Sequence, residues 1–137
     1  PEATKEKDLF HWCTPLHIVC FNGAPAEVVS LLLDQCPEAT REKDRHGCTP
    51  LHLTCCYIVS VGVVSLLLDR CPEATRRKDN HGYTPLHSAC FNGAEMDVIL
   101  LLLETYPEAI LETNDTGKTP ADIAEERNAP EDIRKLL

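Results

Sequence analysis

The sequence predicts an all-α solenoid, in which short helix pairs stack side by side. One observation is that Thr-Pro recurs with a period of 35 residues, at Thr14, Thr49, Thr84 and Thr119. A second is that Pro-Glu-Ala recurs at intervals of 35 or 36 residues, at Pro1, Pro37, Pro72 and Pro107. A third is that apolar segments of short-helix length alternate with polar connectors. A fixed period of this size is typical of linear repeat arrays.

The first predicted helix of each repeat begins at Thr-Pro. The Thr hydroxyl can cap a free backbone N–H, and Pro fits the first helical position because it has no N–H to leave unpaired. In the first copy the helix continues through PLHIVCF, residues 15–21. Asn-Gly follows at 22–23, and again at 92–93, and predicts a turn with positive φ.

The second predicted helix of the first copy covers residues 24–36. Glu27 lies in its first turn, where a carboxylate suits the helix dipole. Its broad apolar face consists of Val28, Val29, Leu31, Leu32 and Leu33. Pro37 ends this helix, and the polar connector that follows contains Gly47, which predicts a tight turn before the next Thr cap.

A helix pair this short cannot bury its apolar face alone, so each repeat needs a neighbour. We therefore predict one array over residues 1–137. Its predicted parts are a tail of a preceding repeat (1–8), three repeats (9–43, 44–78 and 79–113) and a charged C-terminal capping repeat (114–137).

These repeats resemble the ankyrin repeat. The matching stretches are DRHGCTPLHLTC (44–55), DNHGYTPLHSAC (79–90) and VVSLLLDQC (28–36). The family period is about 33 residues, and we place the two additional residues in loops, where insertions are tolerated. The resemblance implies an L-shaped stack with a row of β-hairpin or loop fingers. It also implies that three histidines hydrogen-bond the connecting loops rather than catalyse: His17, His52 and His87.

The second copy departs most from the pattern. Ile58 stands where Gly23 and Gly93 stand, and a β-branched residue is strongly disfavoured at positive φ, so we expect another turn there. The surrounding run 57–64 carries no charge. Either neighbouring repeats cover this run, or it forms an exposed apolar patch that meets a partner.

The eight cysteines recur with the repeat instead of forming obvious pairs, as Cys20, Cys55 and Cys90 show. We expect reduced, mostly buried thiols. Zinc binding by the His-x-Cys sequences at 11–13 and 46–48 is the alternative. It is weakened because later copies have Tyr and Lys at the cysteine position and because the chain contains no CxxC pair. We expect no metal and no cofactor.

Composition and motifs narrow the class of function. The chain has no phosphate loop, G-x-S-x-G, HExxH or kinase motif, so we predict that it is not an enzyme. A formal net charge of −9 argues against nucleic acid and anionic membranes as partners. The longest apolar run, 57–68, is short of the ~20 residues that span a bilayer. We expect a cytoplasmic, or else nuclear, protein.

The ankyrin resemblance implies a scaffold that binds another protein through its concave side, formed by the finger tips and the first helices. The residues it places there are Phe10, His11, Trp12, Arg45, His46, Tyr57, Asn80, His81, Tyr83, Phe91, Asn92 and Lys118. Aromatic residues are only 5% of the chain, and several fall in this set. Buried aromatic anchors commonly dominate interface energy.

Two alternatives stay open. The chain could be a self-associating assembly element, although we expect a monomer with at most weak self-association. It could also be the recruitment domain of a larger enzyme. The connectors of repeats two and three carry a net positive charge, which would favour an acidic partner segment if these charges are used in binding.

Overall fold

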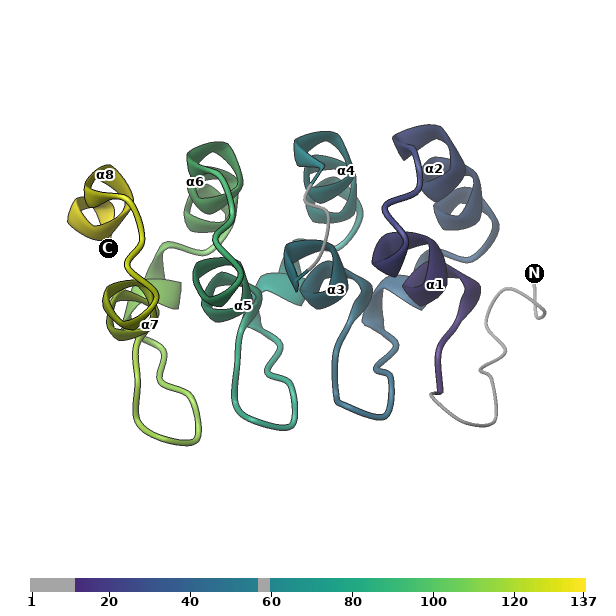
Figure 1. The fold of residues 1–137 in the computed structure, drawn as a ribbon. Helices are drawn as coiled ribbons and strands as arrows, with labels where there is room; N and C mark the ends of the chain where they lie inside the picture. The colour runs from purple at the N-terminus through teal and green to yellow at the C-terminus, as the bar shows by residue number, and fades with distance from the viewer. Residues whose placement is uncertain (1–11, 57–59) are drawn as a thin grey trace.

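A computed structural model describes residues 12–56 and 60–137, and in these residues the chain is a row of four helix pairs (Figure 1). The pairs are α1 (Pro15–Phe21) with α2 (Ala26–Gln35), α3 (Pro50–Cys56) with α4 (Val61–Arg70), α5 (Pro85–Phe91) with α6 (Met96–Thr105), and α7 (Pro120–Glu126) with α8 (Glu131–Leu136). Within the described residues there is no β-strand. The predicted all-α solenoid is therefore confirmed, while the fingers are loops and not β-hairpins.

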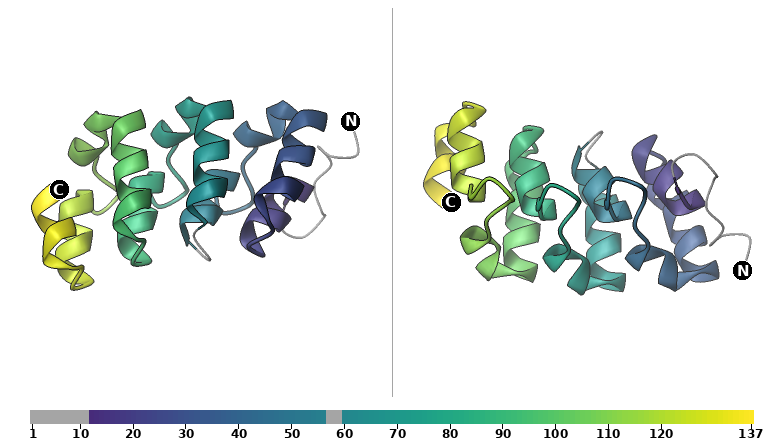
Figure 2. Two further views of the ribbon diagram at one scale, coloured as in Figure 1. Left: turned by 90° about the horizontal axis from the view of Figure 1, so that it is seen from above. Right: turned by 90° about the horizontal axis from the view of Figure 1, so that it is seen from below.

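The helix pairs stack in register. The first helices, α1, α3, α5 and α7, form one row, the second helices form another, and the finger loops hang from the row of first helices (Figure 1). Successive first helices contact one another, as do the second helices α2, α4 and α6. Views from above and below show the same succession of pairs (Figure 2). Each repeat thus buries its apolar face against the next, as the period predicts.

The Thr-Pro helix starts are confirmed, with histidine in an added role. The Thr84 side chain accepts a hydrogen bond from the His87 N–H at 3.3 Å, and His87 Nδ1 accepts one from the Thr84 N–H at 3.2 Å. This reciprocal capping box usually employs Glu or Gln. At the last pair Asp122 replaces the histidine and accepts from the Thr119 N–H at 2.9 Å.

The connectors contain short 3-10 helices that the sequence analysis did not predict: η1 (Pro37–Arg41), η2 (Pro72–Arg76) and η3 (Pro107–Leu111). In η2 the Thr75 hydroxyl donates to the Pro72 carbonyl at 2.7 Å. Each of these turns also buries its alanine: Ala39, Ala74 and Ala109. The connectors are therefore anchored in the core and are not wholly polar loops.

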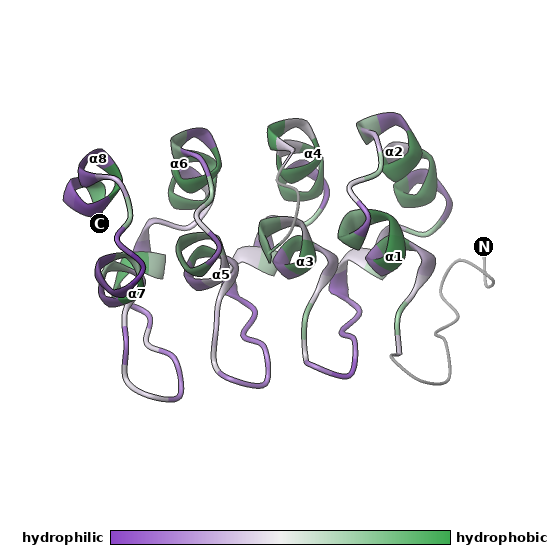
Figure 3. Cartoon of the chain, in the orientation of Figure 1, coloured by the Kyte–Doolittle hydropathy of each residue, from purple (hydrophilic) through white to green (hydrophobic). Residues whose placement is uncertain are grey.

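The core runs along the whole stack as rows of equivalent residues. One row is Leu16, Leu51 and Leu86, and another is Cys20, Cys55 and Cys90. The eight cysteines are not joined in disulfides, and five of them are buried. Figure 3 shows the contrast between the apolar helix layers and the polar finger loops.

The inter-helix turns agree with the sequence where the structure describes them. Gly23 and Gly93 have φ of 69° and 71°, as predicted. The expectation for Ile58 concerns residues 57–59, which lie outside the described residues. The described part of the uncharged run 57–64 is partly buried and partly exposed. Val63 and Val64 lie in the core, whereas Val61 is exposed.

Candidate functional site

The finger of the third repeat is shaped by one aspartate. Asp79 Oδ1 accepts hydrogen bonds from the backbone N–H groups of His81 at 2.8 Å and Tyr83 at 3.0 Å. The Asp79 N–H donates to the Tyr83 carbonyl at 2.9 Å and closes the loop. Gly82 supplies the left-handed turn between them, with φ of 79°. These hydrogen bonds and the glycine turn together define the conformation of the finger.

Neighbouring fingers are tied to each other. The Asn80 N–H donates to the His46 carbonyl, and the Asp115 N–H donates to the His81 carbonyl, both at 3.0 Å. The approach is close, because a Cβ atom on Gly82 would lie 2.7 Å from the Asp115 nitrogen. The finger tips therefore form a continuous edge rather than separate loops.

Buried histidines fix the base of each finger. His52 Nδ1 accepts from the Thr49 N–H at 3.2 Å, so its proton lies on Nε2, which donates to the Tyr83 carbonyl at 2.8 Å. His17 and His87 repeat the arrangement with the carbonyls of Cys48 and Lys118, at 3.1 and 2.9 Å. Burial lowers the pKa of His52 and of His87, which favours the neutral ring. The structural role implied for these histidines is confirmed.

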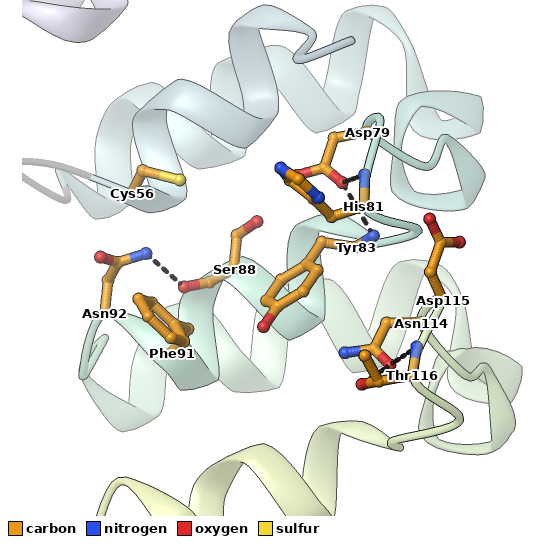
Figure 4. A pocket seen from close by; sticks show the side chains of 10 residues that line it. All are labelled: Cys56, Asp79, His81, Tyr83, Ser88, Phe91, Asn92, Asn114, Asp115 and Thr116. Carbon is orange, nitrogen blue, oxygen red and sulfur yellow. Dashed lines mark hydrogen bonds between the residues drawn. The ribbon is translucent and has the colours of Figure 1, made fainter. Parts of the chain in front are cut away.

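A hollow of about 540 Å³ opens beside the third finger (Figure 4). Finger residues line one side, and side chains from α3 and α5 line the other. Its lining consists of Cys56, Asp79, His81, Tyr83, Ser88, Phe91, Asn92, Asn114, Asp115 and Thr116. Residues from three consecutive repeats therefore converge on one concave site.

An aromatic pair forms the apolar part of this hollow. The rings of Tyr83 and Phe91 lie 6.0 Å apart at 80°, an edge-to-face arrangement. Phe91 is 39% exposed and Tyr83 is half-buried. The Arg127 guanidinium lies 4.3 Å from the centre of the Phe91 ring, and Arg127 Nε donates to the Phe91 carbonyl at 3.0 Å. Phe91 is thus held in place from the side of the last repeat.

The remaining lining is polar. Asn92 Nδ2 donates to the Ser88 carbonyl at 2.8 Å. Asn114 Oδ1 accepts from the N–H groups of Thr116 and Lys118, each at 3.0 Å, and shapes the next finger. Burial raises the pKa of the Cys56 thiol, which keeps it uncharged. Hydrogen-bonding groups and an aromatic face together suit a site for a side chain or short segment of another molecule.

The structure brings together only part of the predicted surface. His81, Tyr83, Phe91 and Asn92 line the hollow. Arg45, His46 and Asn80 are exposed on the finger tips beside it. Lys118 forms an ion pair with Glu126 at the edge of the last repeat. Tyr83 is half-buried, and its ring packs against Phe91.

Trp12 is 58% exposed and has φ of 58°, at the place where the later fingers have glycine. Phe10, His11 and Tyr57, also predicted for this surface, lie outside the described residues. Of the predicted surface, the residues that line the hollow all belong to the third repeat.

Sequence reasoning did not assign two residues of the hollow, Asp79 and Ser88, to the binding surface. Asp79 was recognised only as part of the repeated finger motif. Ser88 could have been found from the sequence, because it stands at the repeat position where the second repeat has Leu53 and the first has Ile18. A polar residue at a repeat position that is otherwise apolar indicates that the surface of this repeat differs from that of its neighbours.

Three ion pairs join neighbouring repeats, one from the end of α4 and two from the connectors. Arg70 pairs with Asp34 at 2.8 Å, Arg41 with Glu73 at 3.4 Å, and Lys78 with Glu112 at 3.0 Å. Two connector cations, Arg41 and Lys78, are therefore already paired within the chain, and the expectation that the connector charges favour an acidic partner segment stays a prediction.

Two broader features bear on the class of function. In residues 12–56 and 60–137, no cluster of three or more His, Cys, Asp or Glu side chains is arranged to hold a metal ion. Over the same ranges, every helix is too short or too polar to cross a membrane.

The stack of helix pairs, the interlocked fingers and the buried Thr-Pro-x-His helix starts define a helical repeat protein. A family model described as ankyrin repeats (3 copies) matches residues 3–76, and one described as ankyrin repeats (many copies) matches residues 67–124. The chain belongs to the ankyrin-repeat family. A search of curated proteins found no match to it. Ankyrin repeats generally mediate protein–protein interaction and are typically non-catalytic.

Proposed function

We propose that this chain is a non-catalytic scaffold that binds a partner protein along its finger loops and first helices, with the hollow at the third repeat as the principal anchor point. The observation that carries this proposal is the convergence of Tyr83 and Phe91 with polar side chains from three repeats. Aromatic side chains at a concave, partly desolvated site are the usual source of binding energy in protein interfaces.

Rigidity of the site favours binding. Asp79 and Asn114 fix the two fingers around the hollow, and His87 fastens the base of the second of them to α5. A surface that is already ordered loses little conformational entropy when a partner docks. The same rigidity leaves the hollow open without a conformational change.

The test is affinity capture of partner proteins by the immobilised chain, compared with a Tyr83→Ala, Phe91→Ala variant. We expect the variant to lose the captured proteins, because truncating central aromatic anchors typically costs about 2 kcal/mol or more of binding free energy each. Leu111→Ala is the matched control, since Leu111 is also a large, strongly exposed apolar residue but lies on η3. A melting curve must show that the variant stays folded, and a folded variant that captures the same proteins as the parent contradicts the proposal.

A second candidate function, self-association, is favoured by the outer face of the first helix pair. Ile18 is 47% exposed, whereas Leu53 at the same address in the second repeat is 7% exposed. Val28 is 40% exposed, whereas its equivalent Val63 is 3% exposed. In the later repeats a preceding helix pair covers the equivalent positions, and the exposed Ile18 and Val28 make this face of α1 and α2 a candidate contact surface for a second copy of the chain.

A further inference from the structure

The charged groups that line the hollow are of one sign. They are the carboxylates of Asp79 and Asp115, and no Lys or Arg belongs to the described lining. Two cations of the last repeat already have partners: Lys118 pairs with Glu126, and Arg127 stacks on the ring of Phe91 at the edge of the hollow. With histidine counted as neutral, the hollow is acidic, and the chain as a whole has a net charge of −9.

Both carboxylates can accept hydrogen bonds from a ligand. The Asp115 side chain is exposed and forms no hydrogen bond or ion pair with the described residues. At Asp79 the two backbone donors both reach Oδ1, so Oδ2 is left for a ligand. Figure 4 shows Asp79 and Tyr83 on the same finger, Asp115 on the next finger, and Phe91 on the helix that follows the first of them.

A site with aromatic and acidic groups favours the side chain of arginine over that of lysine. A guanidinium group is planar, carries five N–H donors and stacks on aromatic faces, whereas an ammonium group is a compact and strongly hydrated charge. Arginine can therefore pair with the carboxylates and contact the ring of Tyr83, which lies on the same finger as Asp79. Lysine offers the charge without the stacking.

The same combination is missing one repeat earlier. The positions 35 residues before Tyr83, Phe91 and Asp115 are Cys48, Cys56 and Asn80. The equivalent positions of the second repeat thus lack the aromatic pair and one of the two carboxylates. A site for a cation built from these groups belongs to the third repeat, although the backbone geometry of the fingers is repeated.

We propose that the hollow selects a partner segment that presents an arginine side chain next to an apolar side chain. The guanidinium lies between Asp79 and Asp115, and the apolar neighbour packs on Phe91. This inference rests on the proposed function and adds the chemical class of the partner. The negative charge of the chain also favours encounter with a basic segment, and this attraction weakens as salt is added.

The experiment is an NMR titration of the full ¹⁵N-labelled chain with acetylated, amidated hexapeptides Gly-Ser-X-Leu-Ser-Gly, where X is arginine, citrulline, lysine or glutamate. Citrulline has the shape of arginine without its charge. We expect saturable shifts of the Tyr83, Phe91 and Asp115 amides with the arginine peptide. The citrulline peptide should bind about fivefold more weakly, because hydrogen bonds to charged groups are stronger than neutral ones.

The variant Asp115→Asn should reduce the preference for arginine over citrulline. Asp69→Asn is the matched control, since Asp69 is an exposed aspartate on α4, and it should leave the preference unchanged. The amide of Arg45, on the finger of the second repeat, should not shift.

Equal affinity for arginine and citrulline, tighter binding of glutamate, or no shift with the arginine peptide up to its solubility limit would each overturn the inference. A lysine peptide that binds as tightly as the arginine peptide overturns the assignment to arginine. These outcomes are separate from the capture experiment: partners that depend on Tyr83 and Phe91 while the arginine preference is absent would leave the proposed function standing and remove only this refinement.

Discussion

At the scale of single residues, the fingers show how one atom can organise a loop. Asp79 Oδ1 receives two backbone N–H groups, and Gly82 permits the left-handed turn that brings them there. Trp12 adopts the same left-handed conformation without being glycine. A non-glycine residue there is strained by about 1–2 kcal/mol, which the first repeat tolerates.

The turn glycines of the third and fourth repeats provide a matched test of this reasoning. Both Gly82 and Gly117 have φ of 79°, but a Cβ on Gly82 would lie 2.7 Å from the Asp115 backbone nitrogen, whereas a Cβ on Gly117 meets nothing within 4 Å. We expect Gly117→Ala to lower the free energy of unfolding by about 1 kcal/mol through the backbone conformation alone.

Gly82→Ala should cost about 2–3 kcal/mol, because crowding against the next finger adds to the same strain. Urea unfolding of the two variants beside the parent chain measures both values. Equal losses would show that the fingers separate freely and that their hydrogen bonds do not tie them together.

At the scale of the helix pair, the Thr-Pro-x-His sequence performs two tasks. It starts the first helix through the Thr–His capping box, and through Nε2 it fastens the next finger. Protonation would place a hydrogen on Nδ1, where the ring accepts the Thr N–H. A buried histidine of this kind works only in its neutral form.

The pH dependence of stability follows from this arrangement. The pKa of His52 and of His87 is lower in the folded chain than the ordinary value of 6.5, chiefly because burial disfavours the charged ring. The unfolded chain therefore binds more protons below that value. We expect the stabilisation to be complete above pH 6.5 and to decline as the pH falls from 6.5 toward the lower folded pKa.

Urea midpoints measured between pH 7.5 and pH 5.5 test how steeply the stability falls with pH. This pH window lies above the range where ordinary carboxyl groups titrate, near pH 4. His87→Gln should flatten the slope, and His81→Gln, on an exposed finger tip, should not. An identical slope in the parent chain and in His87→Gln would contradict the neutral role of this ring.

At the scale of the whole molecule, stability comes from contacts between neighbouring pairs, so the outer faces of the stack differ from its interior. Helices α7 and α8 expose charged side chains, among them Glu125, Glu126 and Arg134. Helices α1 and α2 expose Ile18 and Val28. An isologous dimer would bring two copies of this apolar face together.

Sedimentation velocity over a range of protein concentrations measures this association. We expect the average mass to rise weakly with concentration for the parent chain and to stay monomeric for Ile18→Lys, Val28→Glu. The matched control is Leu136→Lys, which adds charge at an exposed apolar position on α8. A parent chain that remains monomeric throughout rules out self-association as a function of this face.

Three sequence features predicted the fold: the period of 35 residues, the Thr-Pro starts and the Asn-Gly turns. From them follow the all-α stack, its helix pairs and buried rows such as Cys20, Cys55 and Cys90. These features are local or repeat at a fixed interval, so a single chain is enough to read them. The 3-10 helices of the connectors were not predicted, because nothing in the sequence marks their alanines as buried until the core around them is known.

The hollow was decided by the tertiary structure alone. Cys56, Tyr83, Ser88 and Asp115 belong to three repeats and have no common spacing in the sequence, yet stacking places them around one concavity. Periodicity specifies which positions are equivalent, but equivalent positions carry different side chains. The chemistry of the site depends on which of these side chains come into proximity across repeats, and that is settled only when the helix pairs pack.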